Sequence, residues 1–280
     1  MTAHGPSPSF SWNAADYSRS SPAQKQWAEE LIAKLGLFGT EHVLDIGCGD
    51  GKVTAGIAGK LPEGHVVGID SSHDMILFAR THFPATTYPN LFFMEMNTEA
   101  LAFRGVFDVI FSNAALHWVH DHTPVLAGVS QSLRPGGRLV IQMGGKGNAA
   151  QVFEAVEVLL QKPPWKELFT GFSFTFGFFG TEEYRVWLQE AGLVPLRVEL
   201  IKKDMVHRTR QDFSGWVRTT WLPYLCQVPD NLHNSFIDAL YDQYTKIYPA
   251  DAHGAIHIGM VRLEVDAIKE SSASPALRNL

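Results

Sequence analysis

The stretch with the clearest chemical potential is VLDIGCGDGKVT, residues 43–54, in which three glycines and two aspartates follow a short apolar run. Glycines let a backbone approach a ligand closely and turn with positive φ. The pattern that starts at Asp45 departs from the dinucleotide-binding G-x-G-x-x-G pattern because Lys52 stands where the third glycine belongs. It also lacks the Gly-Lys-Ser/Thr end of a P-loop. We therefore expect a loop that holds a ligand other than a dinucleotide or a nucleoside triphosphate.

Two carboxylates suggest the identity of that ligand. Asp45 lies at the end of the apolar run HVLDI, and Asp70 ends the next apolar run, HVVGID. A carboxylate at Asp45 would repel a phosphate and attract a cation, such as the α-ammonium group of an amino acid. Asp70 could accept hydrogen bonds from both hydroxyls of a ribose. A ligand with a ribose and an ammonium group but no phosphate is S-adenosylmethionine.

The elements that position these residues alternate along the chain. Alternating strands and helices predict a doubly wound, mostly parallel α/β sheet with helices on both faces. After residue 147 the alternation weakens, and we expect a helical, aromatic cap before two last strands, with a capping box of Thr209 and Asp212 opening one of its helices. The expected strands are 42–46, 65–70, 91–95, 107–113, 136–143, 195–207 and 256–268, and the expected helices include 51–61, 73–82, 123–133 and 148–162.

Composition narrows the class of protein. The 280 residues are 45% hydrophobic, and the net charge of −6 is spread evenly along the chain. The absence of a basic region argues against nucleic acid as a partner, because phosphate contacts dominate such binding. Cys48 and Cys226 are too few for a disulfide framework. No run approaches the ~20 apolar residues of a membrane span, and we see no secretory signal, so we expect a soluble, cytoplasmic protein.

Residues 40–143 resemble class I S-adenosylmethionine-dependent methyltransferases, which have a seven-stranded Rossmann-like sheet. The matching segments are VLDIGCGDG, VVGIDSSHDMI, NTEALAF, FDVIFSNAALHWV and LRPGGRLVI, in the order and spacing of the family. The flanking segments YSRSSPAQKQWAEELI, DFSGWVRTTWLPY and IHIGMVRLEVDA are similar to small-molecule enzymes of the trans-aconitate methyltransferase and juvenile-hormone-acid methyltransferase type. The resemblance implies S-adenosyl-L-methionine as cofactor and a small molecule as methyl acceptor.

The resemblance also implies roles for individual residues. Asp70 would bind the ribose, with Ser71 and Met75 beside the adenine, and Asn113 would lie near the sulfonium. Asn97 stands where relatives often have aspartate, so we expect weaker discrimination at the adenine amino group. The complete set of cofactor-binding residues that we expect is Tyr17, Asp45, Gly47, Gly49, Asp70, Ser71, Met75, Asn97, Thr98 and Asn113.

The acceptor residues are predicted less directly. Gln24 could orient an acceptor carboxylate, although a helix cap starting at Ser21 explains it equally well. His117 could orient the acceptor or act as a general base, or it could fill the core together with Trp118. Arg218, beside Trp221, could bind a carboxylate or could only extend from an apolar face. The histidines of HWVHDH lack regular ligand spacing, so we expect no metal.

The leading hypothesis is an S-adenosylmethionine-dependent O-methyltransferase acting on a carboxylate of a small organic acid resembling trans-aconitate. The alternatives are transfer to a phenol or carbon atom, and a non-catalytic cofactor-binding subunit. We expect Arg262 to be structural, His257 to be buried, and phenylalanines 169–179 to form cap core with room for an apolar acceptor. The expected organisation is an N-terminal arm and helix (1–36), a cofactor-binding core (37–147), an acceptor cap with the last strands (148–270) and a frayed tail (271–280).

Overall fold

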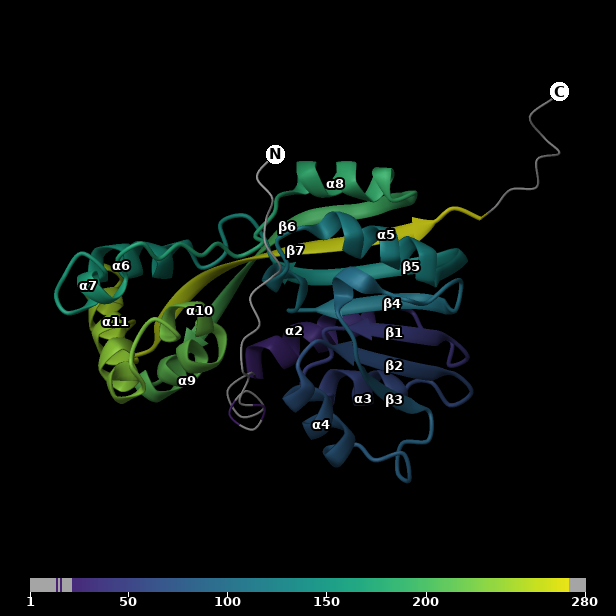
Figure 1. Cartoon of the computed structure of the whole chain (residues 1–280), viewed down its shortest axis with the longest axis horizontal. Helices are drawn as coiled ribbons and strands as arrows, with labels where there is room; N and C mark the ends of the chain where they lie inside the picture. The colour runs from purple at the N-terminus through teal and green to yellow at the C-terminus, as the bar shows by residue number, and fades with distance from the viewer. Residues whose placement is uncertain (1–13, 15, 17–21, 272–280) are drawn as a thin grey trace.

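The computed structural model describes residues 14, 16 and 22–271, and within 22–26 it describes the backbone only. A single seven-stranded sheet with the order β3-β2-β1-β4-β5-β7-β6 runs through the molecule (Figure 1). The last strand, β7, is antiparallel to both of its neighbours, and the other strand pairs in the sheet are parallel. The predicted seven-stranded, mostly parallel sheet is confirmed. Its strands are β1 (His42–Ile46), β2 (His65–Asp70), β3 (Leu91–Glu95), β4 (Phe107–Asn113), β5 (Leu133–Gly144), β6 (Leu193–His207) and β7 (Ile256–Lys269).

Helices cover both faces of the sheet, as the alternating pattern predicts. On one face α2 (Pro22–Ala33), α3 (Lys52–Ala58) and α4 (His73–His82) bury apolar residues against β1 to β5. On the other face α5 (His122–Ser132) and α8 (Thr181–Glu190) do the same. Short 3-10 turns in the described part of the chain are η1 (Thr98–Ala100), η2 (Leu116–Trp118) and η3 (Asp230–Leu232).

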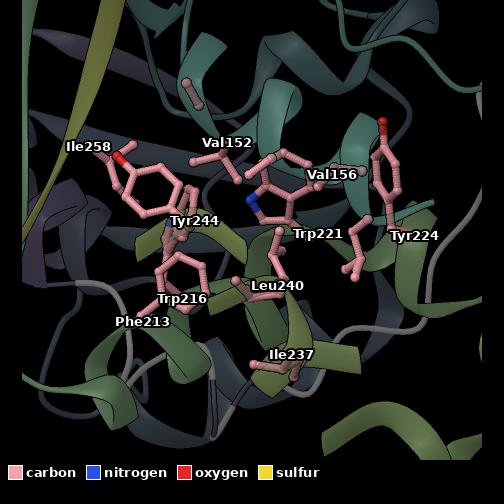
Figure 2. Packing of buried hydrophobic residues seen from close by; sticks show 14 of the residues in the cluster. Val152, Val156, Phe213, Trp216, Trp221, Tyr224, Ile237, Leu240, Tyr244 and Ile258 are labelled. Carbon is pink, nitrogen blue, oxygen red and sulfur yellow. The ribbon is translucent and has the colours of Figure 1, made fainter. Parts of the chain in front are cut away.

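The cap stands on the ends of β6 and β7 that extend beyond the rest of the sheet (Figure 1). It consists of α6 (Ala150–Leu159), α7 (Trp165–Leu168), α9 (Arg210–Thr220), α10 (Leu222–Leu225) and α11 (His233–Ile247). Figure 2 shows aromatic and aliphatic side chains from α6, α9, α10, α11 and β7 converging to form a core of its own. The cap therefore has the buried apolar surface that an independent packing unit requires.

Local sequence signals decide several boundaries. The capping box at the start of α9 is present: the Thr209 hydroxyl accepts from Asp212 N at 3.1 Å, and the Asp212 carboxylate accepts from Thr209 N at 3.0 Å. Asp121 caps α5 by accepting from Thr123 N at 2.9 Å. Within the described residues, no helix combines the length and apolarity needed to cross a membrane.

Candidate functional site

The glycine loop after β1 lies at the carboxyl end of the parallel strands. Gly47, Gly49 and Gly51 have φ values of 72°, 51° and 81°, in the left-handed region that side chains disfavour. A Cβ on Gly47 would lie 2.1 Å from the Cβ of Ala115, so this loop is in direct contact with the loop after β4. The predicted glycine positions thus serve a tight turn and a close approach of two loops.

Asp45 lies beneath this loop and is almost fully buried. One carboxylate oxygen accepts a hydrogen bond of 2.7 Å from the Thr54 hydroxyl. Burial raises the pKa of Asp45 to about 7, an effect that the Thr54 hydrogen bond opposes and the negative charge of Asp70 reinforces. A cation near this carboxylate would be stabilised, since it would neutralise a charge that water does not reach.

Asp70 holds the glycine loop and faces it from the end of β2. Its two carboxylate oxygens accept from Gly49 N at 3.0 Å and from Ser72 N at 2.9 Å. Burial raises the pKa of Asp70, and the backbone hydrogen bonds oppose that rise. Because a carboxylate has about four acceptor sites, Asp70 can still accept a hydrogen bond from a ligand hydroxyl, such as that of a ribose.

The residues expected beside an adenine lie on the loops after β2 and β3. Met75 is buried in the first turn of α4, and Ser71 is exposed just before that helix. Asn97 is exposed, and its amide oxygen already accepts from Glu99 N at 2.9 Å at the start of η1. The Thr98 hydroxyl is buried and has no hydrogen-bond partner among the described residues. Asn97 thus keeps one further acceptor site on its amide oxygen.

Taken together, the loop, the buried Asp45 and the remaining acceptor capacity of Asp70 fit S-adenosylmethionine. The fit rests on the buried carboxylate that a cation would stabilise and on glycine backbone that a Cβ would block. Asn113 ends β4 at the same edge of the sheet, beside Ala114. Tyr17 and the side chain of Gln24 lie outside the described residues.

A cleft opens beyond the end of β4. Ala114, His117 and Trp118 form one wall, so the cleft begins next to the loop that Gly47 contacts. Its walls combine aromatic side chains from the sheet edge, the cap and α2. The residues that line it are Trp27, Ala114, His117, Trp118, Asn148, Ala149, Phe153, Phe176, Phe178, Met205, Trp216, Thr220, Trp221, Met260 and Arg262.

Arg262, which we expect from the sequence to be structural, is the residue with a permanent charge among the described residues that line this cleft. Its side chain is 3% exposed, and its guanidinium carbon lies 5.2 Å from the ring centroid of Trp27 on α2. Arg262 pairs with Gly144, the last residue of β5, so it lies where β7 leaves the sheet and enters the cap. A guanidinium has five fixed donors and matches a carboxylate in two-point contact.

Two acidic side chains on β7 form ion pairs within the sheet. Glu264 is 1% exposed and forms ion pairs with Lys34, at 2.7 Å, and with Arg197. Asp266 pairs with Arg138 at 2.7 Å. These pairs fix the end of α2 to the sheet and thereby hold Trp27 against Arg262.

His117 lies in the cleft as a neutral base. Burial lowers the pKa of His117 well below its usual 6.5, and the positive charge of Arg262 lowers it further. Its Nδ1 is buried and has no hydrogen-bond partner among the residues that the structure describes. The backbone around it is fixed, since the carbonyl of His117 accepts from Gly177 N at 2.9 Å and His122 Nε2 lies 2.9 Å from the carbonyl of Leu116.

Three expectations on the cap meet different outcomes. Trp118 and Trp221 line the cleft, and their role toward an acceptor stays a prediction. Arg218 is not among the lining residues; its Nε donates to Asp16 at 2.8 Å, which gives it a protein carboxylate as partner. His257 is 47% exposed and bonds Asp204 at 2.7 Å, so the expectation of a buried histidine is wrong.

Backbone strain concentrates at the cleft. Among the described non-glycine residues, Ala114 and Ala149 have positive φ, 56° and 53°, and both line the cleft. Such a conformation costs about 1–2 kcal/mol for a non-glycine residue and is typical of functional sites. The three histidines of HWVHDH do not converge: in the described part of the chain no group of three or more His, Cys, Asp or Glu side chains could hold a metal.

Known proteins resemble this chain in sequence over most of its length. A family model described as a methyltransferase domain matches residues 43–137. The chain is 28% identical to trans-aconitate 2-methyltransferase of Shigella dysenteriae, over 91% of this chain and 97% of that relative. It is 32% identical to the uncharacterized methyltransferase C70.08c of Schizosaccharomyces pombe, over 74% of this chain and 79% of that relative.

Solved structures resemble it in fold. The YcgJ protein of Bacillus subtilis superposes with a TM-score of 0.62 at 17% identity, covering 88% of this chain and 99% of that one. A phosphoethanolamine N-methyltransferase 2 of Haemonchus contortus, solved with S-adenosyl-L-methionine, gives a TM-score of 0.58 at 16% identity, covering 92% of this chain and 57% of that one. With its glycine loop and strand-end carboxylates, the chain belongs to the class I S-adenosylmethionine-dependent methyltransferases.

Proposed function

We propose that this enzyme transfers a methyl group to a carboxylate oxygen of a small organic acid. The observation that carries the proposal is the position of Arg262, a buried guanidinium in the wall of a cleft that is lined largely by aromatic side chains and opens beside the cofactor loops. A buried cation of this kind favours an anionic ligand, because the ion pair forms in a medium of low dielectric constant. The cofactor supplies the methyl group, already activated on a sulfonium.

The residues of the chain then have to orient the acceptor and exclude water. A carboxylate is ionised at pH 7 and needs no base. Arg262 would hold the carboxylate by charge-assisted hydrogen bonds. His117 would face it as a neutral imidazole and could donate one further hydrogen bond from whichever ring nitrogen carries the proton.

The same geometry weakens the alternative of a phenol or carbon acceptor, which would need a general base. His117 is the candidate base, but burial and Arg262 hold its pKa well below 6.5. A base whose conjugate acid is that strong has little driving force to remove a proton from a phenol or a carbon atom.

Arg262→Met tests the proposal. We expect the KM for an accepted acid to rise about 10- to 100-fold, from loss of a charge-assisted pair of about 1.5–3 kcal/mol, while the affinity for S-adenosylhomocysteine stays nearly constant. The KM of Arg262→Lys should lie between those of the natural enzyme and Arg262→Met, because lysine keeps the positive charge but cannot make the two-point contact of a guanidinium. Arg218→Met is the matched control, because Arg218 is an arginine that lies outside the cleft and pairs with Asp16.

Product chemistry decides between acceptor types. A methyl ester is cleaved by mild alkali, whereas a methyl ether or a methylated carbon is not. His117→Ala should reduce turnover only modestly with a carboxylate acceptor, and by ~10²–10⁴ with an acceptor that needs a base. An alkali-stable product, or an Arg262→Met variant with unchanged KM, would overturn carboxyl transfer.

A further inference from the structure

We infer, on the basis of the proposed carboxyl transfer, that the preferred acceptor is a monocarboxylic acid with an apolar body rather than a di- or tricarboxylate. The relatives of known substrate are named for trans-aconitate, a tricarboxylate. The cleft of this chain has a different chemical character from the one that three carboxylates would need.

The number of charges is the first step. Among the described residues that line the cleft, Arg262 is the one with a permanent charge, and His117 is neutral. One guanidinium can satisfy one carboxylate in two-point contact. A second or third carboxylate would lose its hydration without gaining a cation, which is strongly unfavourable for an ionised group.

The walls of the cleft are the second step. Phe153 contacts Trp221 with ring centroids 4.9 Å apart, Trp118 contacts Phe176 at 5.1 Å, and Phe176 stacks on Phe178 at 5.0 Å. Aromatic rings present negatively polarised faces, which repel an anion and accept an apolar body. A carboxylate placed against these aromatic faces would therefore be disfavoured. The polar lining residues Asn148 and Thr220 are uncharged and supply no cation for a further carboxylate.

The wall is also preformed. Figure 2 shows Trp216 and Trp221 among the packed side chains of the cap core, and both are almost fully buried. The opposite wall is fixed by Gly177 N, which donates to the carbonyl of His117 at 2.9 Å. An apolar acceptor would thus enter an ordered site with little loss of side-chain entropy.

Adaptable apolar side chains complete the walls of the cleft. Met205 and Met260 line the cleft as well, and their flexible thioethers adapt to irregular apolar shapes. We therefore expect an aryl, terpenoid or medium-chain aliphatic body attached to the reacting carboxyl group.

The test is a series of straight-chain monocarboxylic acids from four to ten carbons, with trans-aconitate and a short dicarboxylate alongside. We expect kcat/KM to rise about fourfold for each methylene that enters the cleft. In calorimetry with S-adenosylhomocysteine present, the heat-capacity change on binding should become more negative along the series. In Phe176→Ala, a variant at a half-buried wall position, the dependence on chain length should be shallower in both measurements.

The outcomes separate the two proposals. If esters form but trans-aconitate is the better acceptor and chain length has no effect, the inference on the acceptor is wrong while carboxyl transfer stands. If long-chain acids bind with the expected heat-capacity trend and no ester forms with any acid, carboxyl transfer is wrong while the apolar character of the cleft stands.

Discussion

Asp45→Asn provides a direct test of the electrostatics beneath the cofactor loop. Burial raises the pKa of Asp45 from 3.8 to about 7 in the folded protein. The folded state therefore binds a proton more tightly than the unfolded chain, so ionisation of Asp45 removes stability as the pH rises from about 4 through 7. Asparagine stays neutral, and its amide oxygen can still accept the Thr54 hydroxyl, which now donates to Asp45 at 2.7 Å.

The expected magnitude follows from the shift. A pKa difference of this size corresponds to about 4 kcal/mol once the carboxyl is fully ionised, at 1.36 kcal/mol per unit. Ionisation of Asp45 lowers the free energy of unfolding by about 1.5 kcal/mol at pH 5 and by about 4 kcal/mol at pH 8. The stability of Asp45→Asn relative to the natural protein should therefore increase by about 2–3 kcal/mol between pH 5 and pH 8.

Urea unfolding at the two pH values, without cofactor, measures this difference. Thr54→Val should enlarge the pH dependence of the natural carboxyl, because the Thr54 hydrogen bond opposes the rise in pKa. Asp45→Asn should stabilise the fold at pH 8 but weaken the binding of S-adenosylmethionine there, because the natural carboxylate is ionised at that pH and attracts the cationic cofactor. A stability difference that is the same at pH 5 and pH 8 would refute the reasoning.

Two further predictions concern the loop and the buried histidines. Gly47→Ala should weaken cofactor binding at least ~10-fold in calorimetry, because a positive φ costs about 1–2 kcal/mol and the new Cβ would collide with Ala115; Gly56→Ala, with open space around it, should bind normally. His207 is buried with a folded pKa of about 4, so its contribution to stability is present above pH 6.5 and is lost as the pH falls toward 4. His207→Phe should therefore lose about 2 kcal/mol less stability than the natural protein between pH 8 and pH 5 in urea unfolding, and equal losses would contradict the assigned shift.

Short-range patterns were sufficient for the sheet and the cofactor loop. The predicted bounds of β1, β2 and β4 coincide with the observed ones, because apolar runs ended by turn residues are a local signal. The capping box at Thr209 is equally local. The sequence did not predict the helices α8 and α11. A dense aromatic stretch precedes α8 and hides the helical periodicity at its start. Leu232, the residue before α11, makes no side-chain cap.

The acceptor residues could not be predicted in the same way, since their roles depend on contacts distant in sequence. Alternation along β7 places Arg262 on the same face as Glu264 and Asp266, and this pattern indicates a charged surface. In the fold, Lys34 and Arg138 neutralise those two acids, and Arg262 alone of the three lines the cleft. Arg218 is a candidate ligand by sequence, but Asp16, 202 positions away, takes its guanidinium.

The two long antiparallel strands explain how one chain combines a general cofactor site with a particular acceptor site. Along β7, Glu264 pairs within the sheet beside Gln142, while Arg262 pairs with the last residue of β5 and reaches the cap. A single continuous strand thus carries a charge from the rigid sheet to the acceptor cleft, where Trp27 of α2 lies beneath it. The position of this charge depends on the sheet and not on the cap helices. Under the proposed carboxyl transfer, changes in the aromatic wall would therefore alter which acid body fits, while the reacting carboxylate would stay beside the cofactor loops.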